Sequence, residues 1–263
     1  MSDPLRAAEH AAEVARMELG ISNEAPLPDL VPLLESTGLG VFLVPLGSDG
    51  LAGAYSLDRD VGFLLVNSNQ APVRQRFTLA HEYAHHRLGH GSLYDITIDQ
   101  ASTDPREAQA NRLAGALLMP RAAVSRWFDD RNSPPIDLEA IVRMAAWFGV
   151  SAAAARVRLE IIGRLKPGAA IRALDRAISV GDHSQLARNL GIVDLNDTIA
   201  RARDAFRAPA VMRQHLLTAY RERLVDEKAV ASILRISKAE LKRMLAADGD
   251  DELPAEILDS ARS

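Results

Sequence analysis

The stretch RFTLAHEYAHHRLGH, residues 76–90, holds four of the seven histidines of the chain. Within it, His81 and His85 are four residues apart, and Glu82 directly follows the first of them. Four residues of an α-helix advance by about 400° and rise by about 6 Å, so both imidazoles project from one face. The stretch therefore predicts a helix that carries two ligands for one metal ion, with Glu82 beside them as the base that activates water.

The other two histidines of the stretch, His86 and His90, are also four residues apart but form a weaker pattern. Arg87 occupies the position of the base, and a cation there would repel a metal ion. We expect these two histidines to be surface groups or neighbours of the ligands, with contact to substrate as an alternative for His86. The longer motif HExxHxxGxxH would need glycine at 88 and histidine at 91, where the chain has Leu88 and Gly91. The third ligand must therefore come from elsewhere.

A bare HExxH motif arises by chance in on the order of one chain in a hundred of this size, so its surroundings matter. The apolar residues 77–80, FTLA, precede the motif and would bury one face of the helix. A predicted β-hairpin lies just upstream, and a peptide could add to its edge as an extra strand. This context favours a metal site over a chance match.

A second predicted helix, in TDPREAQANRLAGALLMP at residues 103–120, supplies the candidate third ligand, Glu107. Asp104 is the expected N-cap and Pro105 the first helical residue. In isolation, Glu107 also fits a capping box, in which its carboxylate returns to the amide of the cap. The alanines and the glycine of this helix would let it approach its neighbour closely enough for the carboxylate to reach a shared ion. Asn111, one turn later, is either a hydrogen-bond partner of a ligand or a structural residue.

The composition sets limits on function. The chain has 263 residues, of which 48% are hydrophobic and 25% charged, as in an ordinary globular protein of one or two domains. It has no cysteine, so a transition metal must be bound by His, Asp or Glu. The net charge of −4 gives no overall attraction to nucleic acid. No apolar run is long enough for a membrane span and no signal peptide is recognisable, so we expect a cytoplasmic protein with no membrane contact.

The order of predicted elements changes near residue 168. Helices are predicted at 5–19 and 27–37, a buried strand in LGVFLVPL, and an antiparallel hairpin in GAYSLDRDVGFLLVNSN, its second strand at Phe63–Val66. The helix at 78–88 follows, and Gly89 and Gly91 end it. After the second motif helix, two helices hinge at FGVS, and from KPGAA onward no strand pattern appears. The sequence predicts an α+β fold with a small antiparallel sheet, followed by an all-α region.

The motifs together resemble the ImmA/IrrE family of zinc metallopeptidases, the HExxH minigluzincins. The resemblance rests on RFTLAHEYAHHRLGH followed by EAQANRLAGALLMP, and it extends over roughly residues 5–165. It implies that His81, His85 and Glu107 bind Zn²⁺, with Mn²⁺ as an alternative ion, and that Glu82 is the general base. The group that stabilises the oxyanion is not identified by the motifs, although Tyr83, His86 and Tyr94 are all candidates.

The resemblance also implies a substrate. Members of the family typically cleave a helix-turn-helix repressor of the XRE type, which releases genes for stress, DNA-damage responses or mobile elements. We therefore expect a zinc-dependent endopeptidase with such a repressor as its partner. The alternative is a DNA-binding or antitoxin-like regulatory protein in which the peptidase-like part is a scaffold that does not cleave. Only the first interpretation needs Glu82.

We place a domain boundary between 167 and 168. Residues 1–167 form the predicted metallopeptidase domain, in which 134–166 are a helix-turn-helix-like pair, and 168–263 form a helical regulatory or interaction domain. In this second part ILRISKAELKRML, with Ser237 as a cap, resembles a helix-turn-helix. Residues 169–247 hold 14 Lys and Arg against 9 Asp and Glu, a net +5 that could contact DNA phosphates. The solvated face of a helical bundle is the favoured interpretation of this charge.

Overall fold

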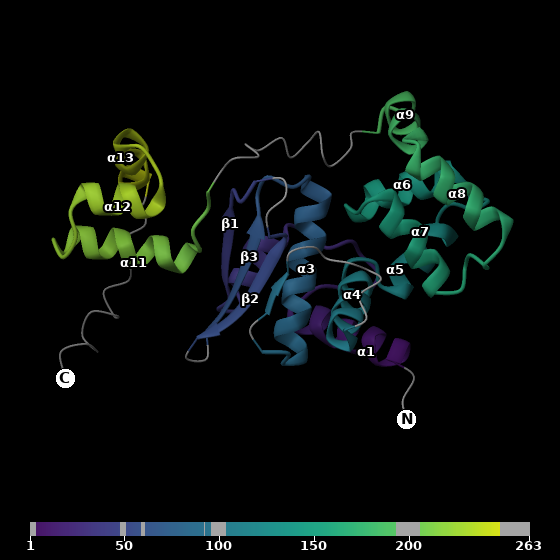
Figure 1. Cartoon of the computed structure of the whole chain (residues 1–263), viewed down its shortest axis with the longest axis horizontal. Helices are drawn as coiled ribbons and strands as arrows, with labels where there is room; N and C mark the ends of the chain where they lie inside the picture. Colours follow the sequence, from purple (N-terminus) through teal and green to yellow (C-terminus); the bar gives the residue numbers. More distant parts are fainter. Residues whose placement is uncertain are drawn as a thin grey trace. The chain divides into compact units, whose positions relative to one another are not determined.

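A computed structural model describes residues 4–47, 51–58, 61–91, 93–95, 104–192 and 206–247 (Figure 1). Two compact units are present, Met1–Arg207 and Ala208–Ser263. The division along the chain falls between residues 207 and 208, whereas the sequence predicts a domain boundary between 167 and 168. The functional division of the chain stays a prediction, because packing alone does not assign a role to either part.

A four-stranded sheet lies in the first unit, in the order β1-β3-β2-β4. Its strands are β1 (Gly40–Val44), β2 (Gly53–Asp58), β3 (Val61–Asn67) and β4 (Leu93–Asp95). The predicted hairpin is confirmed: β2 and β3 are antiparallel, and Asp58 faces Val61 at the turn. The α+β class is confirmed as well. The sheet is mixed, however, because β1 runs parallel to β3. The expectation of an antiparallel sheet was wrong for β1, since a run of apolar residues identifies a strand but not the direction of its partner.

The helix α3 (Pro72–Leu88) carries the HExxH motif and packs with one side on β2 and β3 and with another on α4 (Pro105–Leu118) (Figure 1). It begins six residues before the predicted start at 78, with Pro72 in its first turn, a position where proline costs no hydrogen bond. It ends as predicted at Gly89, whose φ of 64° is left-handed and favours glycine. The motif is thereby held between the sheet and α4.

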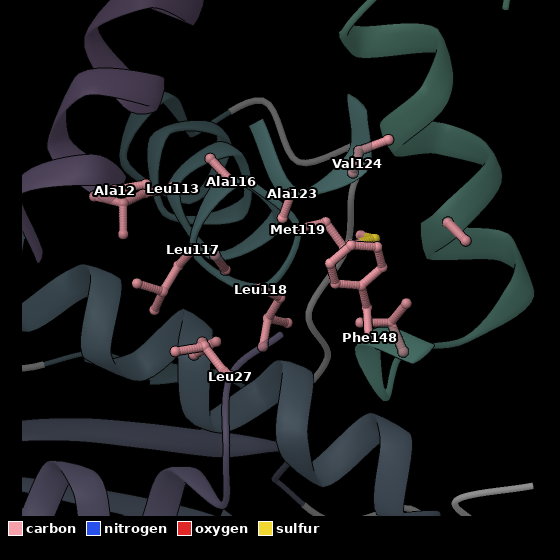
Figure 2. Packing of buried hydrophobic residues seen from close by; sticks show 14 of the residues in the cluster. Ala12, Leu27, Leu113, Ala116, Leu117, Leu118, Met119, Ala123, Val124 and Phe148 are labelled. Carbon is pink, nitrogen blue, oxygen red and sulfur yellow. The ribbon is translucent and has the colours of Figure 1, made fainter. Parts of the chain in front are cut away.

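The remaining helices of the first unit build its core. They are α1 (Pro4–Glu18), α2 (Leu30–Glu35), α5 (Arg121–Asp129), α6 (Leu138–Phe148), α7 (Ala152–Ile161), α8 (Ala169–Ser179) and α9 (Asp182–Asn189). Figure 2 shows Leu117, Leu118 and Met119, at the end of α4, among the buried apolar side chains that include Phe148 of α6. The predicted hinge between α6 and α7 is present as a bend of 102°. This core fixes the helix that carries Glu107.

Two buried arginines contact the carboxyl end of α4. Arg16 of α1 is completely buried and donates to the carbonyl oxygen of Leu117 over 2.6 Å. Arg158 of α7 is 2% exposed and donates from Nε to the carbonyl oxygen of Met119 over 2.7 Å. Pro120 follows and cannot continue the helix, so these donors satisfy carbonyls that would otherwise be buried without a partner. Burial, and secondarily Arg76, lowers the pKa of Arg16 to about 10, so its side chain stays charged near neutral pH.

A short segment at the end of the first unit extends the sheet. Arg207 forms an antiparallel bridge with Leu43 of β1, through two backbone hydrogen bonds of 2.8 and 3.1 Å. Its guanidinium donates to both carboxylate oxygens of Glu35 at the end of α2, over 2.8 and 2.6 Å. The outer edge of β1 is therefore paired at Leu43.

The second unit contains α11 (Ala210–Arg221), α12 (Glu227–Leu234) and α13 (Lys238–Ala247). Its described residues 208–247 contain no strand, in agreement with the predicted all-α C-terminal region. Across the described part of the whole chain, no single helix has the length and hydropathy of a membrane span, and α6 and α7 meet that test only as a bent pair.

Candidate metal centre

Three side chains from two helices converge on one point. His81 and His85 project from α3 and are completely buried, and their Nε2 atoms are 2.9 Å apart. Glu107 reaches them from the first turn of α4, with Oε2 3.1 Å from Nε2 of His81 and Oε1 3.3 Å from Nε2 of His85. The structure thus brings together the three residues that the motifs nominate as metal ligands.

The donor set fits a divalent transition-metal ion. Two ligands that each lie about 2.0–2.1 Å from a tetrahedral zinc ion are separated by about 3.3 Å, close to the three distances observed. The donors are two imidazoles and one carboxylate, the combination typical of catalytic zinc sites that leave one position open. Among the described residues, this is the group of His, Asp and Glu side chains with the geometry of a metal site.

Local structure explains how Glu107 is presented. The side chain of Asp104 accepts from the backbone amide of Arg106 over 2.8 Å, and Pro105 starts the helix, as predicted. Glu107 lies in the first turn of α4, where its charge is favourable to the helix dipole. Both of its oxygens are turned toward the histidines, which is the arrangement that the ligand interpretation predicts. Asn111 lies one turn later on α4, and its role beside the ligands stays a prediction.

Glu82 follows His81 on α3 and is completely buried between the helix and the sheet. Gly53 of β2 faces it: a Cβ at that position would overlap Oε1 of Glu82, lie 3.0 Å from its Cδ and lie 2.5 Å from Cγ2 of Thr78. Gly53 is paired on both sides, with Val66 of β3 and Asp95 of β4, so its backbone cannot easily retreat. The missing side chain of Gly53 therefore makes the space that the carboxylate of Glu82 occupies.

Replacing Gly53 by Ala is expected to displace the carboxylate of Glu82 and to lower the catalytic rate by about 10²-fold, since a misplacement of about 1 Å near the reacting groups has that effect. The three atoms nearest to a Cβ at this position belong to Glu82 and Thr78 and not to the ligands, so metal stoichiometry should stay unchanged. Steady-state cleavage rates and metal analysis of the purified variant would check this. Gly115 of α4, where a Cβ would meet nothing within 4 Å, gives the matched control Gly115→Ala. Equal activity of the two variants would contradict the role given to Gly53.

His90 contacts a metal-ligand candidate from outside the centre. The left-handed turn at Gly89 returns the chain toward α3, and Nδ1 of His90 lies 2.9 Å from Nδ1 of His85. Nε2 of His90 lies 3.2 Å from Oε1 of Gln109 on α4. One set of tautomers satisfies both contacts: His85 donates from Nδ1 to His90, which donates from Nε2 to Gln109. That set leaves the lone pair of Nε2 of His85 directed at His81 and Glu107, as a metal ligand requires.

Replacing His90 by Ala is expected to weaken metal affinity by about 10–100-fold, the usual cost of removing a partner that orients a ligand. His90→Asn, which keeps an acceptor and a donor, should recover part of the loss. Competition with a chromophoric chelator would measure the affinities. His10→Ala is a control, because His10 is exposed on α1. Affinity of the His90→Ala variant within twofold of the wild type would rule out the orienting role.

His86 does not form a second metal site with His90, and the two side chains have different partners. Nδ1 of His86 lies 3.1 Å from the hydroxyl of Tyr55 on β2. Burial raises the pKa of the Tyr55 hydroxyl. Burial and the nearby charge of Arg87 lower the pKa of His86. The neutral imidazole of His86 therefore accepts a hydrogen bond from the protonated hydroxyl of Tyr55. Tyr83 packs against His86, with ring centroids 6.2 Å apart.

The three candidates for stabilising the oxyanion lie on two elements, α3 and β4. Tyr83 and His86 lie together on α3, next to Tyr55 of the sheet. The backbone of Tyr94 in β4 pairs with that of Ala54 in β2, and the side chain of Tyr94 lies outside the described residues.

The comparisons with known proteins agree with the motifs. Residues 34–160 match the Peptidase M78 family model, described as the IrrE N-terminal-like domain. The radiation response metalloprotease IrrE of Deinococcus deserti is 40% identical over an alignment of 119 residues that covers 42% of this chain. The chain covers 41% of the length of that relative. The His-His-Glu group lies inside the matched residues 34–160, so the resemblance predicted from the motifs is confirmed.

Proposed function

We propose that the protein is a zinc-dependent endopeptidase. Two observations carry the proposal together. The side chains of His81, His85 and Glu107 lie within hydrogen-bond distance of one another, and a buried carboxylate, that of Glu82, follows His81 on α3. A binding module without catalysis would have no use for that carboxylate. The sequence similarity to a radiation response metalloprotease supports the same activity.

The residues of the chain divide the chemistry between them. When bound, a zinc ion would supply Lewis acidity toward water and the scissile carbonyl. Glu82 accepts the proton of the attacking water and later delivers it to the leaving amine. Glu107 would offset part of the charge of a bound ion, and His90 keeps His85 in the tautomer that could bind it. Gly53 keeps the space in which Glu82 works.

We propose zinc as the native ion because two imidazoles and one carboxylate are the ligands that zinc commonly has in hydrolases. The same ligands accept manganese, so the identity of the ion in the cell also depends on metal supply. Metal analysis of protein purified from cells grown with both ions would separate the two cases: a clear excess of zinc supports the proposal, and a clear excess of manganese contradicts it.

We propose a helix-turn-helix repressor of the XRE type as the substrate, cleaved in the cytoplasm to derepress stress, DNA-damage or mobile-element genes. This step rests on the resemblance to the ImmA/IrrE family. A single folded repressor as substrate also fits a small domain in which the described connections between elements are short.

The test is incubation of the purified protein with the repressor-like protein encoded nearest to it, with zinc or with a chelator, and mass spectrometry of the products. We expect two fragments with zinc, none with the chelator, and none from the Glu107→Gln variant in either condition. An intact repressor that copurifies with wild type and variant alike would favour the scaffold alternative. Cleavage that persists in the chelator and in Glu107→Gln would overturn the metal mechanism.

A further inference from the structure

The helices α12 and α13 of the second unit form a helix-turn-helix with a short, well-defined turn. Asp226 caps α12 by accepting from the backbone amide of Ala229 over 2.7 Å. Arg235 ends that helix in the left-handed region at φ 53°, and only residues 235–237 separate it from α13. Ser237 and Glu240 then form a reciprocal capping box, in which each side chain accepts from the backbone amide of the other residue.

A small core fixes the two helices and determines which face of α13 is exposed. Val230 and Leu234 of α12, Leu241 of α13 and Leu217 of α11 are buried. Leu241 therefore marks the inner face of α13. The opposite face carries four exposed residues, two small and two basic, at the helical spacing i, i+3, i+4 and i+7: Ala239, Lys242, Arg243 and Ala246.

The helical part of this unit is positively charged. Residues 208–247 contain eight Lys and Arg against four Asp and Glu, a net charge of +4, whereas residues 248–263 contain one Arg against six Asp and Glu. Three of the four acids are engaged within the unit: Asp226 caps α12, Glu240 accepts from Ser237, and Oε2 of Glu227 lies 3.6 Å from Nζ of Lys238. Lys242 and Arg243 are both exposed on this face, where Arg243 also interacts electrostatically with Glu240.

We propose that the second unit binds double-stranded DNA, with α13 in the major groove and its basic residues on the phosphates and base edges. A helix fits the major groove of B-form DNA, which is about 12 Å wide, and in helix-turn-helix proteins the second helix occupies it. Ala239 and Ala246 add no bulk that would hold the helix away from the groove. Double-stranded RNA is the poorer fit, because its major groove is deep and narrow.

This inference does not depend on the peptidase proposal, because it involves neither the metal ligands nor Glu82. If both hold, the DNA-binding unit would bring the peptidase to the same molecule that a repressor occupies. The two proposals fail separately, since DNA binding is measured without any substrate protein and with the Glu82→Gln variant.

The test is a fluorescence-anisotropy titration of a labelled mixed-sequence 30-base-pair DNA duplex with the full chain, at several salt concentrations. The double variant Lys242→Glu/Arg243→Glu is expected to bind at least tenfold more weakly and to reduce the salt slope by about two, one unit for each lost phosphate contact. The matched control is Arg172→Glu/Arg176→Glu, which makes the same charge change on exposed residues of α8 and should lose less than threefold.

A second variant guards against loss of folding. Ala239→Glu adds a carboxylate in the first turn of α13, where negative charge favours the helix, but places it on the proposed DNA face. We expect at least fivefold weaker binding with an unchanged circular dichroism spectrum. Failure of the wild type to bind the duplex, equal losses in the α13 and α8 double variants, or equal affinity for an RNA duplex of the same sequence would each overturn the proposal.

Discussion

Replacing Glu82 by Gln is expected to lower the cleavage rate by about 10²–10⁴-fold, the usual contribution of a general acid–base. The amide has the size of the carboxylate and fills the same buried space beside Gly53, but it cannot accept the proton of the attacking water. Metal content should stay at the wild-type level, because Glu82 is not among the three side chains that converge. Rates measured on a purified repressor, with metal analysis of each preparation, check both parts.

The matched control for this prediction is Glu13→Gln, the same chemical change at an exposed position of α1. It should retain full activity. A Glu82→Gln variant that cleaves at more than a tenth of the wild-type rate with full metal content would show that another group moves the proton. Loss of metal together with activity would instead assign Glu82 to the ligand set.

The motifs predict which three side chains converge, because the information for this is local. The spacing of His81 and His85 determines their common face on any regular helix, and the cap at Asp104 determines where Glu107 lies on the next one. Both helices form as expected, and the small residues of α4 allow them to pack together. The sequence therefore identifies which residues meet without any knowledge of the sheet.

The surroundings of the centre could not be predicted in the same way, because they depend on contacts between distant segments. Gly53 is essential to the space around Glu82 only because β2 passes that point. His90 contacts His85 only because Gly89 turns the chain back, and that glycine was recognised as a helix end without this consequence. The strand β4 is three residues long and follows a polar stretch, so its pattern is too short to recognise.

The same dependence on distant segments explains why the sequence does not predict the direction of β1, and the polar start of α3 explains why its first residues are missed. A continuous apolar run predicts the strand β1, but its parallel pairing with β3 depends on how the chain connects β1 to β2. The first turns of α3 contain Arg74 and Gln75 and lack an apolar stripe, so the predicted helix starts too late. Pro72 was the available signal, since proline is common at the first position of a helix.

Replacing Arg158 by Ala is expected to lower the free energy of unfolding by about 3–5 kcal/mol, the cost of removing one partner of a buried ion pair. Arg158 is 2% exposed and donates to both carboxylate oxygens of Glu9, over 2.6 and 2.8 Å, so its loss leaves a carboxylate in a mostly buried position. The carbonyl oxygen of Met119, at the end of the helix that carries Glu107, loses its donor as well.

Urea denaturation of the metal-free protein, followed by circular dichroism, measures this difference. Arg143→Ala is the matched control, because Arg143 and its partner Glu139 have side chains that are 45% and 48% exposed, and an exposed pair of this kind contributes less than about 1 kcal/mol. Since Arg158 joins α7 to α1 and to the end of α4, its removal should also make the chain around the centre easier to cleave by an added protease. If Arg158→Ala and Arg143→Ala unfold at the same urea concentration, the buried pair does not hold these helices together, and the apolar core alone positions α4.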